Sequence, residues 1–295
     1  MLTTAAIVTD VRPPQRLPPA FAPRRTVAPS SDPPPMPTEA RPTTDAPFRV
    51  KVCGITSTDD ARLVAEAGAD AVGLNFVPGS PRCVDVTRAV EITAALPPSV
   101  LKVGVFAGMP AVRVADLADA VGLDAIQFHG HLAPACCGAP PWPWDPPNVC
   151  AALAPRLVVR AARLRAEGPA AAALDEARGW IRAAAAAGRA PAMLLVDAGA
   201  PAGAPAGALG GTGKVVDWRR LVDAGPIGLP LALAGGLTPG NVAAAIRATG
   251  AAAVDTASGV ESSPGRKDRS LVECFVREAL EAFARRTAAP PTAAG

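Results

Sequence analysis

A cysteine and an aspartate end two short apolar, β-prone runs, and together they supply the groups needed for proton transfer. Cys53 ends the run 50–53 just before a glycine-containing turn, and Asp197 ends the run 194–197. A thiol and a carboxylic acid that face each other across a cavity can act as base and acid in moving a proton between carbon and oxygen. We therefore take both as candidate catalytic residues, although a free cysteine taken alone is more often a small buried hydrophobic residue.

Further polar residues lie at or just after the ends of other β-prone runs. Gln127 and His129 lie at the end of the run that starts at residue 124, and Asp255 ends the run 252–255. The Asp255 carboxylate would hold a substrate hydroxyl or brace the neighbouring loop. Arg82, in the loop 80–82, could fork onto a carboxylate, although an arginine in a surface loop is usually only solvated.

A glycine-rich stretch, residues 210–214, looks at first like a nucleotide-binding loop. It lacks the G-x-x-x-x-G-K-[ST] spacing, and it does not lead directly from a strand into a helix. We interpret it instead as a flexible active-site loop that includes Gly213, with residues 198–209 mobile before a ligand binds.

The elements that must position these residues alternate between β-prone runs and alanine-rich helical stretches, which predicts repeated βα units on a parallel sheet. The expected strands are 48–53, 70–76, 101–106, 124–128, 156–161, 192–197, 230–234 and 252–255. The expected helices lie near 58–67, 87–95, 110–121, 147–153, 169–187, 217–223, 239–248 and 268–286. Eight of each over about 240 residues predicts an α/β fold, a single (β/α)8 TIM barrel, with an open doubly wound sheet as the alternative.

Local signals mark several boundaries. Thr58 should cap the first helix, with acidic residues in its first turn, and Gly68 should end it. Thr238 and Pro239 should begin the seventh helix, where the missing N–H of proline costs nothing. Residues 131–150 are rich in proline and should form an irregular insertion between the fourth and fifth strands.

In a barrel of this kind, ligands bind at the carboxyl ends of the strands, and the last two loops commonly hold phosphate. Gly235 and Gly236 follow the seventh strand, while Ser258 and Gly259 follow the eighth. Glycines let backbone N–H groups approach an anion closely, although either pair alone could simply make a tight turn. Both pairs in the expected loops favour a phosphate site.

Composition narrows the classes of partner. The chain has 295 residues, a net charge of +3 and 4% aromatic residues, with scattered basic residues and no basic, aromatic surface of the kind that binds nucleic acid. Its six cysteines form no C-x-x-C pair, and neither His129 nor His131 has zinc-finger spacing to a cysteine, so we expect no metal. No run approaches the ~20 apolar residues of a membrane span, and no signal peptide is evident. We expect a cytoplasmic protein with reduced thiols.

The two ends of the chain should lie outside the fold. Residues 1–47 hold 12 prolines and almost no aliphatic periodicity, so we expect a disordered extension before a barrel domain at 48–287, followed by a disordered tail at 288–295. The arginines of the extension are like those of a transit peptide, but its prolines oppose the amphipathic helix that such peptides form. A misplaced start is also open, since Met36 lies close to the first strand.

Taken together, the motifs resemble the phosphoribosylanthranilate isomerase family of tryptophan biosynthesis over residues 49 to about 280. The segments that carry the resemblance are Lys51–Thr56, Gly68–Gly73, Ser80–Arg82, Val103–Phe106, Gln127–Gly130, Gly210–Lys214 with Asp217–Trp218, Leu233–Asn241 and Ser258–Asp268. One of these segments would be weak evidence, whereas eight in the family's order are strong. The chain departs from the family at Thr256-Ala257, where a valine and a serine are usual.

The resemblance implies a reaction and a set of roles. The reaction is the Amadori rearrangement of N-(5-phosphoribosyl)anthranilate to 1-(2-carboxyphenylamino)-1-deoxyribulose 5-phosphate. Cys53 would be the general base that acts at C2′, and Asp197 the general acid that opens the furanose ring. Arg82 would hold the anthranilate carboxylate, and the loops 235–236 and 258–259 the phosphate. No cofactor or metal is implied, and the expected partner is a small phosphoribosyl substrate bound by a monomer or homodimer.

Two alternatives remain at this point. A related phosphosugar barrel such as indole-3-glycerol phosphate synthase would need catalytic lysines at strand ends, and Lys51 lies on the same face of its strand as Cys53. Such a synthase has no comparable use for Asp197. A catalytically silent protein that binds phosphate ligands is the second alternative, because a fold does not determine a function.

Overall fold

The computed structural model describes residues 46–129, 145–164, 170–198, 219–223 and 225–288. The chain divides into two units, residues 1–40 and 41–295, and all described residues lie in the second. The expectations for residues 1–45, for most of the insertion at 131–150, for the loop at 210–214 and for residues 289–295 therefore lie outside the described part.

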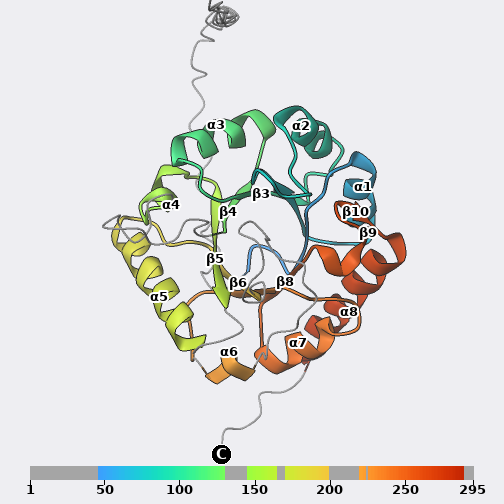
Figure 1. The fold of residues 1–295 in the computed structure, drawn as a ribbon. Coiled ribbons are helices and arrows are strands. Elements are labelled where there is room, and N and C mark those ends of the chain that lie inside the picture. The colour runs from blue at the N-terminus through green and yellow to red at the C-terminus, as the bar shows by residue number, and fades with distance from the viewer. Residues whose placement is uncertain (1–45, 130–144, 165–169, 199–218, 224, 289–295) are drawn as a thin grey trace, which may run out of the picture. The chain divides into compact units, whose positions relative to one another are not determined.

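Within the described residues, eight parallel strands close into a barrel in the order β1 to β8, and helices surround it (Figure 1). The strands are β1 (Val50–Cys53), β2 (Ala71–Asn75), β3 (Leu101–Phe106), β4 (Ala125–Phe128), β5 (Leu157–Leu164), β6 (Met193–Ala198), β7 (Leu231–Ala234) and β8 (Ala253–Thr256). The (β/α)8 barrel predicted from the sequence is confirmed, and the open doubly wound sheet is wrong.

The helices follow the strands in the expected alternation. They are α1 (Thr58–Glu66), α2 (Val86–Ala94), α3 (Ala111–Val121), α4 (Val149–Ala152), α5 (Ala170–Ala186), α6 (Arg219–Asp223), α7 (Val242–Thr249) and α8 (Arg269–Ala288). After β8 the chain adds a short 3-10 turn at Ser258–Val260 and a two-stranded antiparallel sheet, β9 (Glu261–Ser263) with β10 (Arg266–Lys267). No described helix has the length and apolarity needed to span a bilayer.

The barrel closes where β1, the first strand, pairs with β8, the last. Lys51 stands opposite Asp255, and Val52 stands opposite Thr256. Because side chains alternate between the two faces of a strand, this register aims Lys51 and Asp255 into the barrel and Val52 toward the helices. In the surrounding layer of helices, α8 lies beside α1 (Figure 1).

Small apolar side chains fill the barrel below the site and so keep water out of its lower part. Those pointing inward are buried: Ala71, Val103, Ala125, Val159, Met193, Leu195, Ala232 and Ala253. Their neighbours along the strands point outward and pack under the helices, among them Val52, Leu74, Ile126, Leu194 and Val254. Inward and outward positions alternate along each strand. Packing the outward apolar side chains under the helices therefore determines which side chains point into the barrel.

Two helix starts differ from the sequence expectation. Helix α1 is capped by Ser57, whose Oγ accepts from the Asp60 N–H at 3.1 Å, and not by Thr58, which is already helical. Helix α7 begins at Val242, after Asn241, rather than at Thr238. The Asn241 side chain explains the shift: its Oδ1 accepts from the Thr238 N–H at 2.8 Å and closes a turn. The expectation that Gly68 follows the end of α1 is met, with φ +92°.

One polar cluster fastens α5 to the outside of the barrel. Arg160 points outward from β5, forms an ion pair with Asp145 and lies 5.2 Å from the ring centroid of Trp180. The Trp180 indole N–H donates to the Asp145 carbonyl at 2.8 Å. The hydrogen bond between Trp180 and Asp145 therefore joins the end of the 131–150 segment to α5, on the outer side of β5.

We expect Trp180→Ala to lower the free energy of unfolding by about 3–5 kcal/mol, because it removes a fully buried aromatic side chain. Trp180→Phe keeps most of the volume and loses the indole hydrogen bond, so a smaller loss of about 1–2 kcal/mol is expected. Urea unfolding followed by circular dichroism measures both. Equal losses for the two variants would contradict the role given to the indole N–H.

Candidate active site

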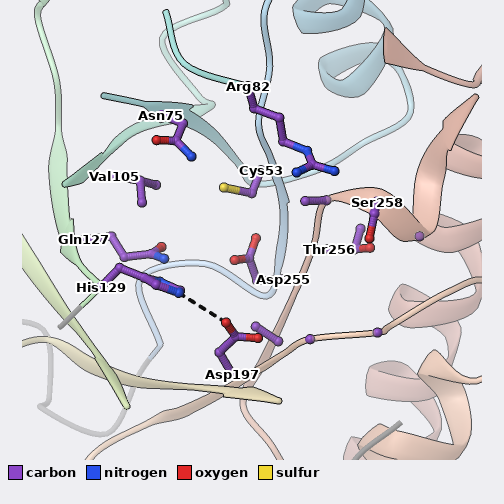
Figure 2. Close-up of a pocket in the computed structure, with 15 residues that line it drawn as sticks. Cys53, Asn75, Arg82, Val105, Gln127, His129, Asp197, Asp255, Thr256 and Ser258 are labelled. Carbon is purple, nitrogen blue, oxygen red and sulfur yellow. Dashed lines mark ion pairs between the residues drawn. The ribbon is translucent and has the colours of Figure 1, made fainter. Parts of the chain in front are cut away.

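A cavity that is open to solvent lies at the carboxyl ends of the barrel strands (Figure 2). Of the residues singled out from the sequence, Cys53, Arg82, Gln127, His129, Asp197, Gly235, Gly236, Asp255, Ser258 and Gly259 line it. Gly213 lies outside the described residues. Its walls come from seven strands, all but β5, and from the loops that follow several of them.

Five further lining residues were not singled out from the sequence: Asn75, Val105, Ala234, Thr256 and Ala257. The period-two alternation could have found the first two. Asn75 lies two residues beyond Gly73, and Val105 lies two beyond the inward-pointing Val103. Ala234 fits the same alternation, since it lies two residues beyond the inward-pointing Ala232. No local signal marks Thr256 and Ala257 as cavity residues, because they depend on how the chain turns at the end of β8.

Cys53 and Asp197 lie on opposite sides of this cavity (Figure 2). Cys53 is the last residue of β1, and Asp197 is the last but one of β6. The space for the Cys53 thiol depends on Gly73, its partner in register on β2. A Cβ at residue 73 would come within 2.6 Å of Cys53 Sγ and 3.0 Å of Lys51 Nζ, so only glycine fits there without a shift.

Lys51 lies one layer below Cys53 and is fully buried. Its Nζ donates to Asp255 Oδ1 at 3.0 Å, which joins β1 to β8 inside the barrel. Burial alone would lower the pKa of Lys51, but the charge of Asp255 and the hydrogen bond to it outweigh burial, and the pKa is raised. Lys51 therefore keeps its proton at neutral pH and places a positive charge under the thiol.

Burial raises the pKa of the Cys53 thiol above its ordinary value. The Lys51 ammonium opposes this rise, the Asp255 carboxylate adds to it, and the Lys267 ammonium opposes it again. At neutral pH the thiol is therefore mostly protonated, and the thiolate that does form is a strong base. The Lys51 and Lys267 ammonium groups stabilise the thiolate and so limit how far burial raises the pKa of Cys53.

Asp197 is held by a histidine. The Nε2 atom of His129 lies 3.2 Å from Asp197 Oδ2, and both side chains are largely buried. This contact holds the carboxyl group beside the cavity, where Figure 2 shows it. Within the described residues, His129 Nδ1 and Gln127 Oε1 have no hydrogen-bond partner, so both buried acceptors are available to a ligand.

Arg82 does fork onto a carboxylate, and that carboxylate belongs to the protein. Its Nε donates to Glu261 Oε1 at 2.8 Å, and its Nη2 donates to Glu261 Oε2 at 2.6 Å. Sequence reasoning did not single out Glu261, although it lies in the stretch 258–268 that carries the resemblance. Within the described part of the chain, Arg82 Nη1 makes no hydrogen bond and remains free to face a second anion.

The two glycine loops meet at one end of the cavity. Gly235 and Gly236 have φ of +83° and +69°, conformations that other residues rarely adopt. Gly259 packs so closely that a Cβ would come within 1.8 Å of the Leu237 carbonyl oxygen. The Thr256 hydroxyl donates to the same carbonyl at 2.8 Å, so the residue that departs from the family pattern joins the two loops.

The arrangement combines a thiol, a carboxylic acid across from it, one cation at the rim and a glycine-lined end. Those groups suit proton transfer on a substrate that carries two anionic ends, one for the cation and one for the backbone N–H groups. Among the described residues, no group of three or more His, Cys, Asp or Glu side chains is arranged to hold a metal ion.

The sequence model for the family described as N-(5'phosphoribosyl)anthranilate (PRA) isomerase matches residues 50–138 and 163–278. A relative of that kind, the N-(5'-phosphoribosyl)anthranilate isomerase of Acidithiobacillus ferrooxidans, is 42% identical over 228 residues, which cover 77% of this chain and 95% of the relative. The family model's match covers every barrel strand except β5, of which it includes only the end, and it covers both glycine loops.

Two solved structures are similar in fold. The phosphoribosyl anthranilate isomerase of Thermotoga maritima superposes with a TM-score of 0.62 at 32% identity, covering 79% of this chain and 99% of that one. A phosphoribosyl anthranilate isomerase in complex with reduced 1-(o-carboxyphenylamino)-1-deoxyribulose 5-phosphate superposes with a TM-score of 0.59 at 30% identity, with the same coverage.

We expect opposite changes in thiol reactivity from the two members of the buried ion pair. Alkylation by iodoacetamide needs the thiolate, so its rate rises with pH through the pKa of Cys53. Lys51→Met removes a positive charge and should move that midpoint to higher pH, whereas Asp255→Asn removes a negative charge and should move it lower. Mass spectrometry of the Cys53 peptide as a function of pH measures both. Shifts in the same direction would contradict this account.

Proposed function

Because the chain belongs to the N-(5'-phosphoribosyl)anthranilate isomerase family, we propose that Cys53 and Asp197 carry the two proton transfers of the isomerisation. The family's reaction is an aldose–ketose isomerisation in tryptophan biosynthesis, so the protein is an isomerase. The family match replaces both alternatives left open by the sequence, the related synthase and the silent binder. The observation that supports the roles is the position of the thiol and the carboxyl group on opposite sides of one cavity.

Asp197 acts first, as the acid. It gives its proton to the furanose ring oxygen while the C1′–O bond breaks, and the lone pair of the anthranilate nitrogen forms the C1′=N bond of the open-chain iminium. His129 supports this role, because its contact with Asp197 Oδ2 at 3.2 Å holds the carboxyl group in place while the other oxygen is free to face the substrate.

Cys53 acts next, as the base. Its thiolate takes the proton from C2′, and the electrons of that bond form the C1′–C2′ double bond as the iminium nitrogen is neutralised. The resulting enolamine then becomes the ketone by taking a proton at C1′ and losing one from the C2′ hydroxyl. Burial raises the pKa of the thiol, so the thiolate is basic enough to abstract a proton from a carbon next to an iminium.

The two anionic ends of the substrate match the two ends of the cavity. Arg82 would receive the anthranilate carboxylate through Nη1, while Gly235, Gly236, Ser258 and Gly259 would surround the phosphate with backbone N–H groups. Asp255 and Gln127, between these ends, would face the ribose hydroxyls. The complex of a relative with reduced 1-(o-carboxyphenylamino)-1-deoxyribulose 5-phosphate supports a ligand of this chemical class.

No step of this scheme needs a cofactor or a metal. Activity without a cofactor or a metal remains a prediction. The monomeric or homodimeric state, the cytoplasmic location and the role of Gly213 in an active-site loop also remain predictions. Dialysis against a chelator tests the first, and light scattering of the purified protein tests the oligomeric state.

We expect Cys53→Ala and Asp197→Asn each to lower kcat by roughly 10²–10⁴-fold, because each removes one proton carrier. Binding of the reduced product analogue should change little, since neither group holds an anionic end. Loss of substrate fluorescence, measured with freshly made phosphoribosylanthranilate, gives the rates, and calorimetry gives the binding. Either variant turning over within tenfold of the wild type would contradict its assigned role.

We expect Gly259→Ala to weaken phosphate binding, because the new Cβ would lie 1.8 Å from the Leu237 carbonyl and the loop would have to move. Inhibition by inorganic phosphate should weaken by about tenfold, while inhibition by anthranilate stays within twofold. An unchanged inhibition constant for phosphate in a folded variant would show that this loop does not hold the phosphate.

A further inference from the structure

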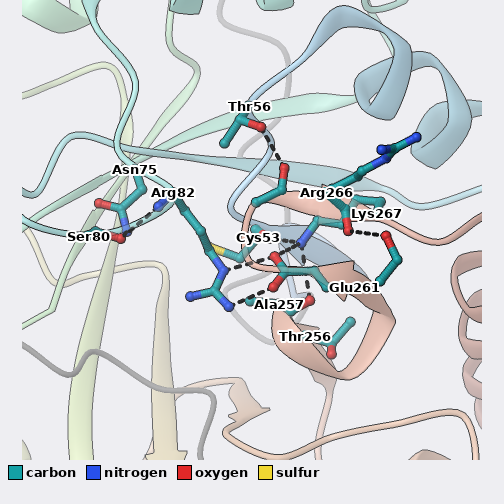
Figure 3. A network of polar contacts seen from close by, with 12 residues as sticks. Cys53, Thr56, Asn75, Ser80, Arg82, Thr256, Ala257, Glu261, Arg266 and Lys267 are labelled. Atoms are coloured by element: carbon teal, nitrogen blue, oxygen red, sulfur yellow. Dashed lines mark hydrogen bonds and ion pairs between the residues drawn. The ribbon is translucent and has the colours of Figure 1, made fainter.

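A small hairpin that is not part of the barrel lies beside Cys53 and Arg82, two residues that line the cavity (Figure 3). It consists of β9 and β10, which follow β8 after the 3-10 turn, and it pairs Lys267 with Glu261 in register. Both side chains are almost completely buried: Lys267 is 0% and Glu261 is 4% exposed. Neither has a role in the scheme above, and two opposite charges are rarely buried without a function or a complete set of partners.

The Lys267 ammonium has three hydrogens and three acceptors, each from a different segment. It donates to the Cys53 carbonyl at 2.6 Å, to the Ala257 carbonyl at 3.1 Å and to Glu261 Oε1 at 2.8 Å. The first acceptor ends the strand that carries the base. The second begins the loop that contains Ser258 and Gly259. One buried cation therefore sets the distance between the base and the proposed phosphate loop.

These carbonyl contacts also orient the peptides that follow. In a trans peptide the N–H points opposite to the preceding C=O. With the Cys53 carbonyl turned to Lys267, the Gly54 N–H points the other way and donates to the Gly73 carbonyl at 2.9 Å. By the same geometry, the Ala257 carbonyl at Lys267 leaves the Ser258 N–H on the far side of its peptide, where Ser258 lines the cavity.

Glu261 extends the network to Arg82. Its Oε1 accepts from both Lys267 and Arg82 Nε, and its Oε2 accepts from Arg82 Nη2. The bidentate contact fixes the plane of the guanidinium and leaves only Nη1 for a ligand. Burial would raise the pKa of the Glu261 carboxyl, but the contacts with Arg82 and Lys267 outweigh it and lower the pKa. Burial lowers the pKa of Lys267, and the charge of Glu261 opposes this lowering. With both cations protonated, the group carries a net positive charge beside the cavity.

Contacts outside the cavity hold the hairpin against the barrel. The Thr56 hydroxyl donates to the Gly265 carbonyl at 2.6 Å, and the Lys267 N–H donates to Asp60 Oδ2 at 3.3 Å. A Cβ at Gly265 would come within 3.2 Å of the Pro81 carbonyl, so the hairpin tip also packs against the loop of Arg82. The hairpin is thus fixed to the loops after β1 and β2, and Lys267 and Glu261 cannot move independently of them.

We propose that Glu261 and Lys267 are positioning residues of the isomerase, which together hold the carboxylate-binding arginine, the base and the phosphate loop in one arrangement. Glu261 aims Nη1 of Arg82 at the carboxylate of the substrate. Lys267 holds Cys53 and the 258–259 loop at the separation that the substrate requires. The proposal rests on the proposed function of the cavity, and it predicts different defects for the two residues.

Glu261→Gln should act mainly at the carboxylate end. The amide NH2 of glutamine would face an N–H of Arg82, so one of the two hydrogen bonds is lost and the guanidinium turns. KM should rise by about tenfold, as for the loss of one charge-assisted hydrogen bond, with kcat within threefold of the wild type. Inhibition by anthranilate should weaken by the same factor, and inhibition by inorganic phosphate should stay within twofold.

Lys267→Met should act at the base and at the phosphate. Without the ammonium, the carbonyls of Cys53 and Ala257 lose their shared donor, so kcat should fall by at least tenfold and inhibition by phosphate should weaken by about tenfold. Arg266→Met is the matched control, because it removes the same charge from the neighbouring, exposed position of β10. It should leave all four constants within twofold of the wild type.

The experiment measures kcat, KM and the two inhibition constants for the full-length wild type and the three variants, with thermal unfolding and near-ultraviolet circular dichroism as folding controls. An active wild type with unchanged constants in folded Glu261→Gln would overturn the proposal, even if Lys267→Met does not fold. Equal weakening of both inhibitors by Glu261→Gln would also overturn it, since that indicates general disorder of the site. A wild type without isomerase activity would instead count against the proposed function, and anthranilate and phosphate binding, measured by calorimetry, would then test the network alone.

Discussion

The closure of the barrel between β1 and β8 is the constraint on which the rest of the structure depends. It brings together the first and last strands of the fold, and the Lys51–Asp255 ion pair seals the seam in an interior otherwise filled by small apolar side chains. Cys53 at the end of β1 and the loop after β8 become neighbours only through this closure. Removing one partner of such a buried pair leaves an uncompensated charge, so the pairing also makes the register specific.

Charge is arranged around the thiol in two layers. Lys51 lies below Cys53 and is paired with Asp255, while Lys267 holds the Cys53 carbonyl and is paired with Glu261. Each ammonium is paired with its own carboxylate, so neither needs the Cys53 thiolate as its counter-ion. For the base proposed here, this arrangement would meet two demands: burial makes the thiolate a stronger base, and the nearby cations limit how far burial raises the pKa of the thiol.

Under the proposed function, backbone and side chains at the rim of the cavity would share the recognition of a doubly anionic ligand. The glycines of the loops after β7 and β8 expose backbone N–H groups, and the Thr256 hydroxyl holds the two loops together through the Leu237 carbonyl. At the other end a single arginine is oriented by Glu261. Backbone groups suit the phosphate because they carry no side-chain entropy, whereas the planar carboxylate matches a guanidinium edge.

The sequence by itself determined the alternation of strands and helices, the barrel, and the residues at the strand ends, including Cys53, Gln127 and Asp197. These follow from patterns that extend over a few residues: the period of two along a strand, the glycine after a helix, and the rule that ligands bind at the carboxyl ends of parallel strands. Even at this range a competing side chain changed the result at Asn241, which closes a turn where the helix was expected to start.

Only the tertiary structure decided which charges meet. Arg82 and Glu261 are 179 residues apart in the chain, Lys51 and Asp255 are 204 apart, and Lys267 lies 214 residues from the carbonyl that it holds. No local pattern records such a pairing, because it depends on closing the barrel in one register and on folding the β9–β10 hairpin back over β1. The polar groups at the strand ends were therefore readable from the sequence, whereas the charged groups that hold them in place were not.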